Sequence, residues 1–427
     1  MIRLLKRGRV FLACIFWISL TQAQSLPTAS PEAVGVSSER LNRLSTTLSQ
    51  YVQDGKMAGS VALIARRGKI VYHEAFGDSD MEADKKMTPD AMFRIASQTK
   101  AIVSVAVMIL QEEGKLLIKD PIGDYLPEWK QTTVAKTTED GGYEVVKAKR
   151  AITIRDLLTH TAGIGYGHGP AKKEWEKASI QNWYFAHRDE PIAATVSRMA
   201  KLPMDAQPGE RFVYGYNTDI LGVIVEKVSG KPLDVFIKER ILDPLNMVDT
   251  YFYLPKNKAN RLATSYMAHK GKPLERSPNP GLGVGQGHYV EGPRKSFSGG
   301  AGLVSTAMDY AKFLQMMLNG GELAENRILS PKTVELMVAD HVDVRGIPYG
   351  SRKGSGFGLG FSITKNVGER GEAGSVGTFE WGGAYGSTYW ADPVEELVVV
   401  YFKQLIPTNG LDDHAKLRSL VYQAIME

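Results

Sequence analysis

Hydrophobic and polar residues follow two different periods near the start of the chain. Between Ser37 and Gly55, leucines and a valine recur every three or four residues behind a pair of serines. This spacing predicts an amphipathic helix. The next two segments, 60–65 and 69–76, are rich in β-branched and aromatic residues and are joined by an Arg-Gly pair. They predict a β-hairpin.

The centre of the chain is predicted to be mostly helical. Residues 92–114 are apolar almost without interruption and end at a glycine, which is typical of a buried helix. Capping residues and stop glycines predict three further helices, within 153–163, 219–230 and 305–321. Segments rich in glycine, charge and aromatic residues are interpreted as excursions bordering a cleft, at 130–149, 163–191 and 279–295.

Strand signals return near the C-terminus. Four β-rich runs precede a closing helix at 411–427, and they lie at 356–365, 377–383, 386–393 and 396–405. The order of elements suggests that both chain ends build one antiparallel sheet. We therefore expect an α/β (α+β) fold in one domain, 24–427. Its sheet lobe, of about 24–90 and 345–427, would stand beside a mostly helical lobe of about 91–344.

The first residues indicate an export signal. Four cations precede an apolar stretch of eleven residues, 10–20, and small residues follow it. This layout predicts a secretory signal peptide over 1–23 and a periplasmic or secreted mature protein. The stretch is too short for a conventional membrane span. A lipoprotein acylated on Cys14 is the less favoured alternative, because only four apolar residues separate Arg9 from that cysteine.

Charge and composition exclude several classes of function. Removing the leader lowers the formal net charge from +5 to about +1, which argues against a nucleic-acid partner. It also removes the only cysteine, so neither disulfides nor thiol catalysis is expected. The histidines form no H-E-x-x-H pair, and no G-x-G-x-x-G follows a strand, so neither a metal nor a cofactor is predicted. A G-x-S-x-G elbow is absent as well.

Ser97 and Lys100 are the strongest candidates for chemistry. They stand three residues apart at the head of the apolar run, so a helix would place hydroxyl and amine on one face. A desolvated lysine can be neutral enough near pH 7 to take the serine proton. The alternative is a lysine that snorkels to solvent, but its apolar neighbours leave no obvious polar face. The pair predicts an acyl-transfer site.

Two later features could complete such a site. Tyr214 stands just before a predicted helix and could relay a proton, although a packed aromatic is the alternative. The run Trp381-Gly382-Gly383-Ala384 joins two predicted strands. Its glycines would let a substrate approach backbone N–H groups, which could form an oxyanion hole with the N–H of Ser97. A plain bulge or turn is the alternative there.

A second serine and lysine with the same spacing are not expected to react. Ser362 and Lys365 fall in a predicted strand, whose alternation sends them to opposite faces. His160, in "LLTHTAG", is interpreted as a structural histidine at a helix end. Neither feature is assigned to the candidate site.

The ordered set of motifs resembles one known superfamily. "SQTK" at 97–100, "LLTHTAG", Tyr214 followed by "DILG", "GGAGLVST" at 299–306 and a late "WGG" occur in this order. Together they resemble the serine β-lactamase-like, penicillin-recognising enzymes, and most closely the family VIII carboxylesterases. The resemblance implies a β-lactamase/transpeptidase-like fold and a small ester or amide substrate. It also implies Ser97 as acylated nucleophile, Lys100 as its base and Tyr214 as proton shuttle.

Departures from the family pattern favour neutral esters. β-Lactamases usually have a lysine, or sometimes a histidine, where this chain has Trp381. Asn217 comes one position late for the amide that binds a substrate carbonyl in those enzymes, so that role is not carried over. A D-stereospecific peptidase, a weak β-lactamase and a non-catalytic cell-wall-binding module remain alternatives. The sequence leaves the oligomeric state open.

Overall fold

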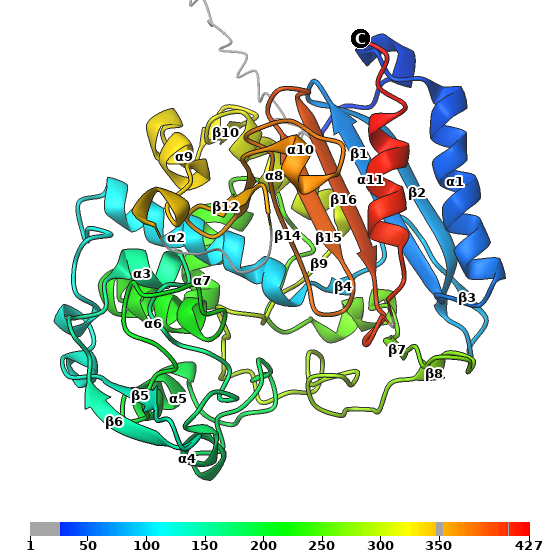
Figure 1. Ribbon diagram of the computed structural model, residues 1–427. Coiled ribbons are helices and arrows are strands. Elements are labelled where there is room, and N and C mark those ends of the chain that lie inside the picture. The colour runs from blue at the N-terminus through cyan, green and yellow to red at the C-terminus, as the bar shows by residue number, and fades with distance from the viewer. Residues whose placement is uncertain (1–25, 347–352, 409) are drawn as a thin grey trace, which may run out of the picture.

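A single large antiparallel sheet organises the computed structural model, which describes residues 26–346, 353–408 and 410–427 (Figure 1). The predicted signal peptide lies outside these ranges. The strand order is β12-β13-β14-β15-β16-β1-β2-β3. The strands are β1 (Gly59–Arg66), β2 (Lys69–Asp80), β3 (Lys85–Lys86), β12 (Ser355–Phe357), β13 (Ser362–Thr364), β14 (Phe379–Gly382), β15 (Thr388–Asp392) and β16 (Leu397–Lys403). Because β1 pairs with β16, the two chain ends meet at the centre of the sheet, as expected.

Helices cover both faces of this sheet. Helices α1 (Ser38–Gln53) and α11 (Asp413–Tyr422) pack together on one face, and α8 (Ala307–Leu318) packs on the other (Figure 1). Strand β1 is buried at every position. Its alternate residues belong to two separate cores, with Leu63 on the α8 side and Ile64 on the α1 side. Two covered faces explain why this strand reads as a continuous apolar run.

The helical lobe stands beside the sheet (Figure 1). Its helices are α2 (Thr99–Glu112), α3 (Ile154–Leu158), α4 (Lys172–Lys177), α5 (Ile192–Met199), α6 (Asn217–Ser229), α7 (Leu233–Ile237) and α9 (Pro331–Val338), and the short α10 (Val367–Arg370) lies nearer the sheet. Paired short strands are β4 (Phe93–Arg94) with β9 (Val304–Ser305), β5 (Thr133–Thr137) with β6 (Tyr143–Lys147), β7 (Tyr266–Met267) with β8 (Glu275–Arg276), and β10 (Glu322–Leu323) with β11 (Asn326–Arg327). No helix in the described ranges is long and apolar enough to cross a bilayer.

Two local expectations need correction. The predicted helix over 92–114 begins only at Thr99, because Phe93 and Arg94 pair with β9 instead. The segment 130–149, interpreted as an excursion, is a hairpin of β5 and β6, which the expectation of a mostly helical centre did not include. In both cases a pairing partner redirects backbone hydrogen bonds that the local pattern leaves open.

Candidate active site

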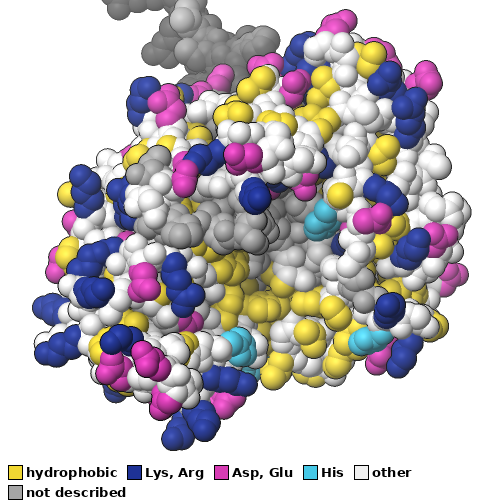
Figure 2. Space-filling view, viewed as in Figure 1, with side chains coloured by type: hydrophobic (Ala, Val, Ile, Leu, Met, Phe, Trp, Pro, Cys, Tyr) yellow, Lys and Arg dark blue, Asp and Glu magenta, His cyan; other side chains and the backbone are white. Residues whose placement is uncertain are grey.

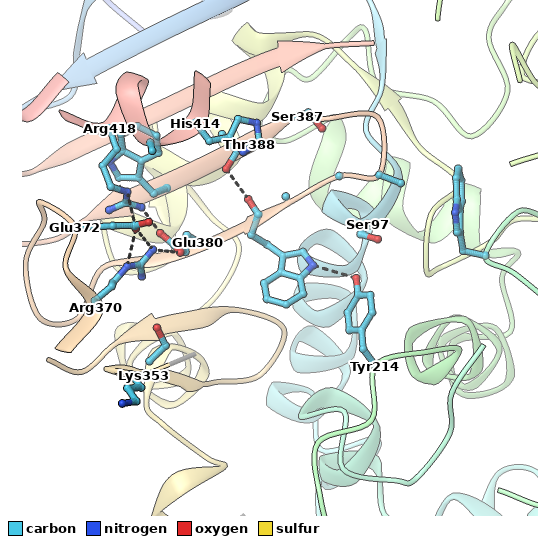
Figure 3. A pocket seen from close by; sticks show the side chains of 18 of the residues that line it. Ser97, Tyr214, Lys353, Arg370, Glu372, Glu380, Ser387, Thr388, His414 and Arg418 are labelled. Carbon is cyan, nitrogen blue, oxygen red and sulfur yellow. Dashed lines mark hydrogen bonds and ion pairs between the residues drawn. The ribbon is translucent and has the colours of Figure 1, made fainter. Parts of the chain in front are cut away.

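Ser97 lies in a tight turn between a strand and a helix. A 3-10 turn at Ala96–Gln98 links β4 to α2, and Ala96 has a φ of +43°. Non-glycine residues rarely adopt positive φ, and such backbone often occurs at active sites. The turn places Ser97 on the wall of a cavity of about 870 Å³ (Figure 3). The serine thus stands just before α2 rather than inside it.

Lys100 is buried one turn away and points at Ser97. Its side chain is only 2% exposed, so the alternative of a lysine reaching solvent is wrong. Its Nζ lies 2.8 Å from the Gly300 carbonyl oxygen, 3.1 Å from Tyr166 Oη and 3.3 Å from Ser97 Oγ. The carbonyl only accepts, whereas the two hydroxyls can donate or accept. The amine can therefore take a proton from Ser97 without losing its other partners.

A buried carboxylate holds the loop that carries the Gly300 carbonyl. Asp219, in α6, accepts hydrogen bonds from Ser298 Oγ (2.6 Å) and from the Gly300 N–H (3.1 Å). Burial raises the pKa of Asp219, and the nearby Lys100 charge acts in the opposite direction. Asp219 thus fixes the carbonyl that orients the lysine.

Tyr214 lies on the same cavity wall and receives a hydrogen bond across the site. The indole Nε1–H of Trp381 donates to Tyr214 Oη at 3.0 Å (Figure 3). The Nζ atom of Lys100 is 4.6 Å from the centre of the Tyr214 ring. A hydrogen bond from the indole fixes the position of the phenol oxygen. Trp381 therefore supports Tyr214 directly, which the sequence did not indicate.

His160 packs against the ring of Tyr214. This contact agrees with the structural role predicted for the histidine. The two ring centres are 4.6 Å apart. Asn217 Nδ2 donates to His160 Nδ1 at 2.9 Å and is also within 3.2 Å of the Ile164 and Val213 carbonyls. Burial and then the Lys100 charge hold the pKa of His160 well below its usual value. Because its amide is used within the protein, Asn217 does not act as a substrate-binding amide.

The turn after β14 comes close to Ser97. A Cβ on Gly383 would lie 2.5 Å from the Ile95 carbonyl oxygen, so only glycine allows this approach. Gly383 donates its own N–H to the Ser387 carbonyl at 2.9 Å. Within the described residues, no such bond engages the N–H of Ala384, which lines the cavity beside Ser97. Of the four residues predicted for substrate binding, Ala384 is best placed to bind an oxyanion.

The chain that carries this site is similar to known proteins over most of its length. The family profile described as Beta-lactamase matches residues 44–423. The chain belongs to the β-lactamase family. The match covers most of the chain and all of the residues discussed above, so the resemblance and the fold class expected from the sequence are confirmed.

Individual relatives of this β-lactamase-family chain include an esterase. Protein Rv1367c of Mycobacterium tuberculosis is 34% identical over 86% of this chain and 90% of its own length. Esterase EstB of Burkholderia gladioli is 31% identical over 87% of this chain and 92% of its own. A solved structure of EstCE1, a hydrolase with promiscuous acyltransferase activity, superposes with a TM-score of 0.76 at 28% identity, covering 90% of this chain and 99% of that one. The protein is a serine hydrolase of this family.

Charged side chains form the wall of the cavity farthest from Ser97 in the close view. Arg370 and Arg418 both pair with Glu380 and with Glu372 (Figure 3). The Arg418 guanidinium also lies 4.6 Å from the centre of the Trp390 ring. Apolar side chains gather in the hollow on this face of the molecule (Figure 2). The cavity of this β-lactamase-family protein therefore combines an apolar part with a polar wall whose charges are largely paired.

The sequence indicated Ser97 as a partner of Lys100 but did not indicate Tyr166 or the Gly300 carbonyl. The second serine and lysine were correctly set aside. Tyr166 lies in a segment interpreted only as a cleft border, and nothing local indicated that its hydroxyl would reach Lys100. Ser362 is buried in β13, whereas Lys365 pairs with Asp340 and Asp343. That second pair therefore forms no site.

Proposed function

We propose that the protein is an exported serine hydrolase that cleaves small carboxylic esters through a Ser97 acyl-enzyme. The observation that carries the proposal is the buried amine of Lys100 within 3.3 Å of Ser97 Oγ. Tyr214 lines the same cavity, and in this proposal it is the second proton-transfer group. A nucleophile beside a base that is itself held by a third group is the arrangement that activates a serine.

Acylation follows from these positions. Ser97 Oγ attacks the ester carbonyl carbon while its proton passes to Lys100 Nζ. The carbonyl oxygen becomes an oxyanion, which the N–H groups of Ala384 and Ser97 stabilise. Tyr214 gives its proton to the leaving alcohol oxygen as the C–O bond breaks, and the proton on Lys100 restores the phenol.

Deacylation reverses the same transfers. Water attacks the acyl carbon, its proton passes to the Tyr214–Lys100 pair, and Ser97 leaves with a proton while the carboxylic acid is released. Export is part of the proposal because the leader 1–23 has the charge, length and small residues of a signal peptide.

Acyl transfer to an alcohol other than water is a second candidate activity. The cavity of about 870 Å³ is far larger than a short ester needs, so an acceptor alcohol could lie beside the acyl group. EstCE1 is described as having promiscuous acyltransferase activity. Product analysis with and without added alcohol separates the two activities, because transfer produces a new ester at the expense of free acid.

We expect kcat/KM for short-chain p-nitrophenyl esters to be well above that for penicillins, with an initial burst of nitrophenol. Trp381 carries no charge, and its only N–H already donates to Tyr214. It cannot supply the charge-assisted bond to a lactam carboxylate, worth roughly 1.5–3 kcal/mol, or roughly ten- to a hundredfold. A neutral ester has no carboxylate to bind, so the absence of a cation at position 381 does not lower its kcat/KM. Stopped-flow release of nitrophenol and nitrocefin hydrolysis measure the two activities.

Two variants of Trp381 sharpen this test. Trp381→Lys should reduce the difference in kcat/KM between esters and penicillins. Trp381→Phe, which keeps a ring without a cation, should leave that difference unchanged. Efficient penicillin turnover by the unmodified protein, together with poor ester turnover, contradicts the assignment. In that case another cation on the cavity wall, such as Lys353, would hold the carboxylate. The absence of any burst or turnover would favour a binding module instead.

A further inference from the structure

The turn that carries Ala384 has few internal hydrogen bonds. Gly383 donates to the Ser387 carbonyl at 2.9 Å, and Gly386 donates to the Gly383 carbonyl at 3.0 Å. Gly386 has a φ of +81°, a conformation that favours glycine. The turn spans residues 383–386, and we call it the oxyanion turn. Its position depends on what holds it from outside.

One outside contact comes from the C-terminal helix. His414, the second residue of α11, lies on the cavity wall, and its Nε2 is 2.8 Å from the Gly386 carbonyl oxygen (Figure 3). A carbonyl oxygen only accepts, so Nε2 must carry the proton. The helix thereby donates a hydrogen bond to the last residue of the oxyanion turn.

A buried ion pair fixes the helix end that carries this histidine. Lys403, the last residue of β16, pairs with Asp413, the first residue of α11, and both side chains are 1% exposed. The Lys403 stem also packs against the turn, because a Cβ on Gly386 would lie 2.5 Å from Lys403 Cε. Buried pairs of this kind fix geometry, since displacing either partner leaves an uncompensated charge.

We propose that His414 is a positioning residue that holds the oxyanion turn at the distance from Ser97 that catalysis requires. The inference rests on the proposed function, because it concerns the oxyanion of that reaction. His414 holds the Gly386 carbonyl, and the Leu405 N–H holds the carbonyl of Tyr385 at 2.9 Å. Loss of the first hold would let the end of the turn at Gly386 move, and Ala384 with it. A shift of the turn by a fraction of an ångström would weaken the hydrogen bond to the oxyanion more than any contact with the ground-state ester.

The test compares replacements that keep or remove the donor at the Nε2 position. His414→Leu removes it and should lower kcat roughly tenfold, less than loss of an oxyanion donor itself, while KM stays within about twofold. Glutamine can place an amide N–H near the position of Nε2, so His414→Gln should stay within about threefold of wild type. Asparagine is one methylene shorter, so His414→Asn should behave like the leucine variant.

A matched control and a second measurement separate positioning from folding. His73 also has its Nε2 within reach of a backbone carbonyl, that of Pro89 at 3.2 Å. It lies in β2, which β16 and β1 separate from β15, and it does not line the cavity. His73→Leu should leave kcat unchanged. Affinity for an arylboronic acid, which forms a tetrahedral adduct on the serine, should fall in step with kcat across the His414 variants.

Two results would overturn the inference. One is a His414→Leu or His414→Asn variant with wild-type kcat and boronate affinity. The other is a loss of kcat that glutamine does not rescue and that matches a loss of thermal stability in every variant. Failure of the proposed function would look different, because the wild-type protein would then form no acyl-enzyme at all.

Discussion

Lys100→Arg is expected to lower kcat for p-nitrophenyl esters by at least about a hundredfold, the scale of a lost general base. Lys100 is buried, and its amine fits between the Gly300 carbonyl, Tyr166 and Ser97. A guanidinium keeps its charge at all working pH values and cannot take the serine proton. The guanidinium group is also larger than the amine that it replaces, and Lys100 is only 2% exposed, so the surrounding space is limited. Steady-state kinetics on the folded variant measure the effect.

Lys365→Arg is the matched control for this substitution. It changes the lysine of the other S-x-x-K, which pairs with Asp340 and Asp343 at a partly exposed position, and should leave kcat within about twofold. Thermal unfolding of both variants shows whether the fold survives. Near-normal turnover by Lys100→Arg, with an intact fold, would remove Lys100 from the role of base.

Tyr214→Phe is expected to lower kcat by about a hundredfold, because it removes the hydroxyl that delivers a proton to the leaving alcohol. The ring, and with it the packing on His160, is retained. The hydrogen bond from Trp381 is lost at the same time. The loss in kcat/KM, which reports acylation, should be smaller for p-nitrophenyl esters than for alkyl esters, because nitrophenolate leaves without needing a proton. Comparing the two ester types measures this difference.

Tyr216→Phe provides the comparison within the same Tyr-Gly-Tyr segment. Tyr216 Oη donates to the Asn182 carbonyl at 2.6 Å, and Tyr216 does not line the cavity. Removing it costs one structural hydrogen bond, about 1 kcal/mol, and should change kcat by no more than about threefold. If Tyr216→Phe lost more activity than Tyr214→Phe, the assignment of the two tyrosines would be reversed.

The sheet and the nucleophile pair could be predicted from the sequence because their signals are local. Runs rich in β-branched and aromatic residues indicated strands such as β1 and β16. The unbroken apolar surroundings of Lys100 indicated a buried amine. The two-residue period of a strand predicted that Ser362 and Lys365 would point to opposite faces and form no site.

The remaining features depend on contacts between distant parts of the chain. Trp381 and Tyr214 are 167 positions apart, so no window along the sequence reveals their hydrogen bond. Tyr166 lies between α3 and α4, 66 positions from Lys100, and contacts it only in the folded chain. Phe93 and Arg94 leave the predicted helix because β9 offers a pairing edge. Local patterns predict elements, whereas these contacts arise only when the elements pack.

Covalent labelling tests the central claim, that Ser97 is the acylated nucleophile. The folded protein would be treated with a fluorophosphonate and the adduct located by peptide mass spectrometry, alongside Ser97→Ala and Ser362→Ala. We predict one adduct on Ser97, lost together with ester hydrolysis in Ser97→Ala and unchanged in Ser362→Ala. Labelling and turnover that persist in Ser97→Ala would contradict the account.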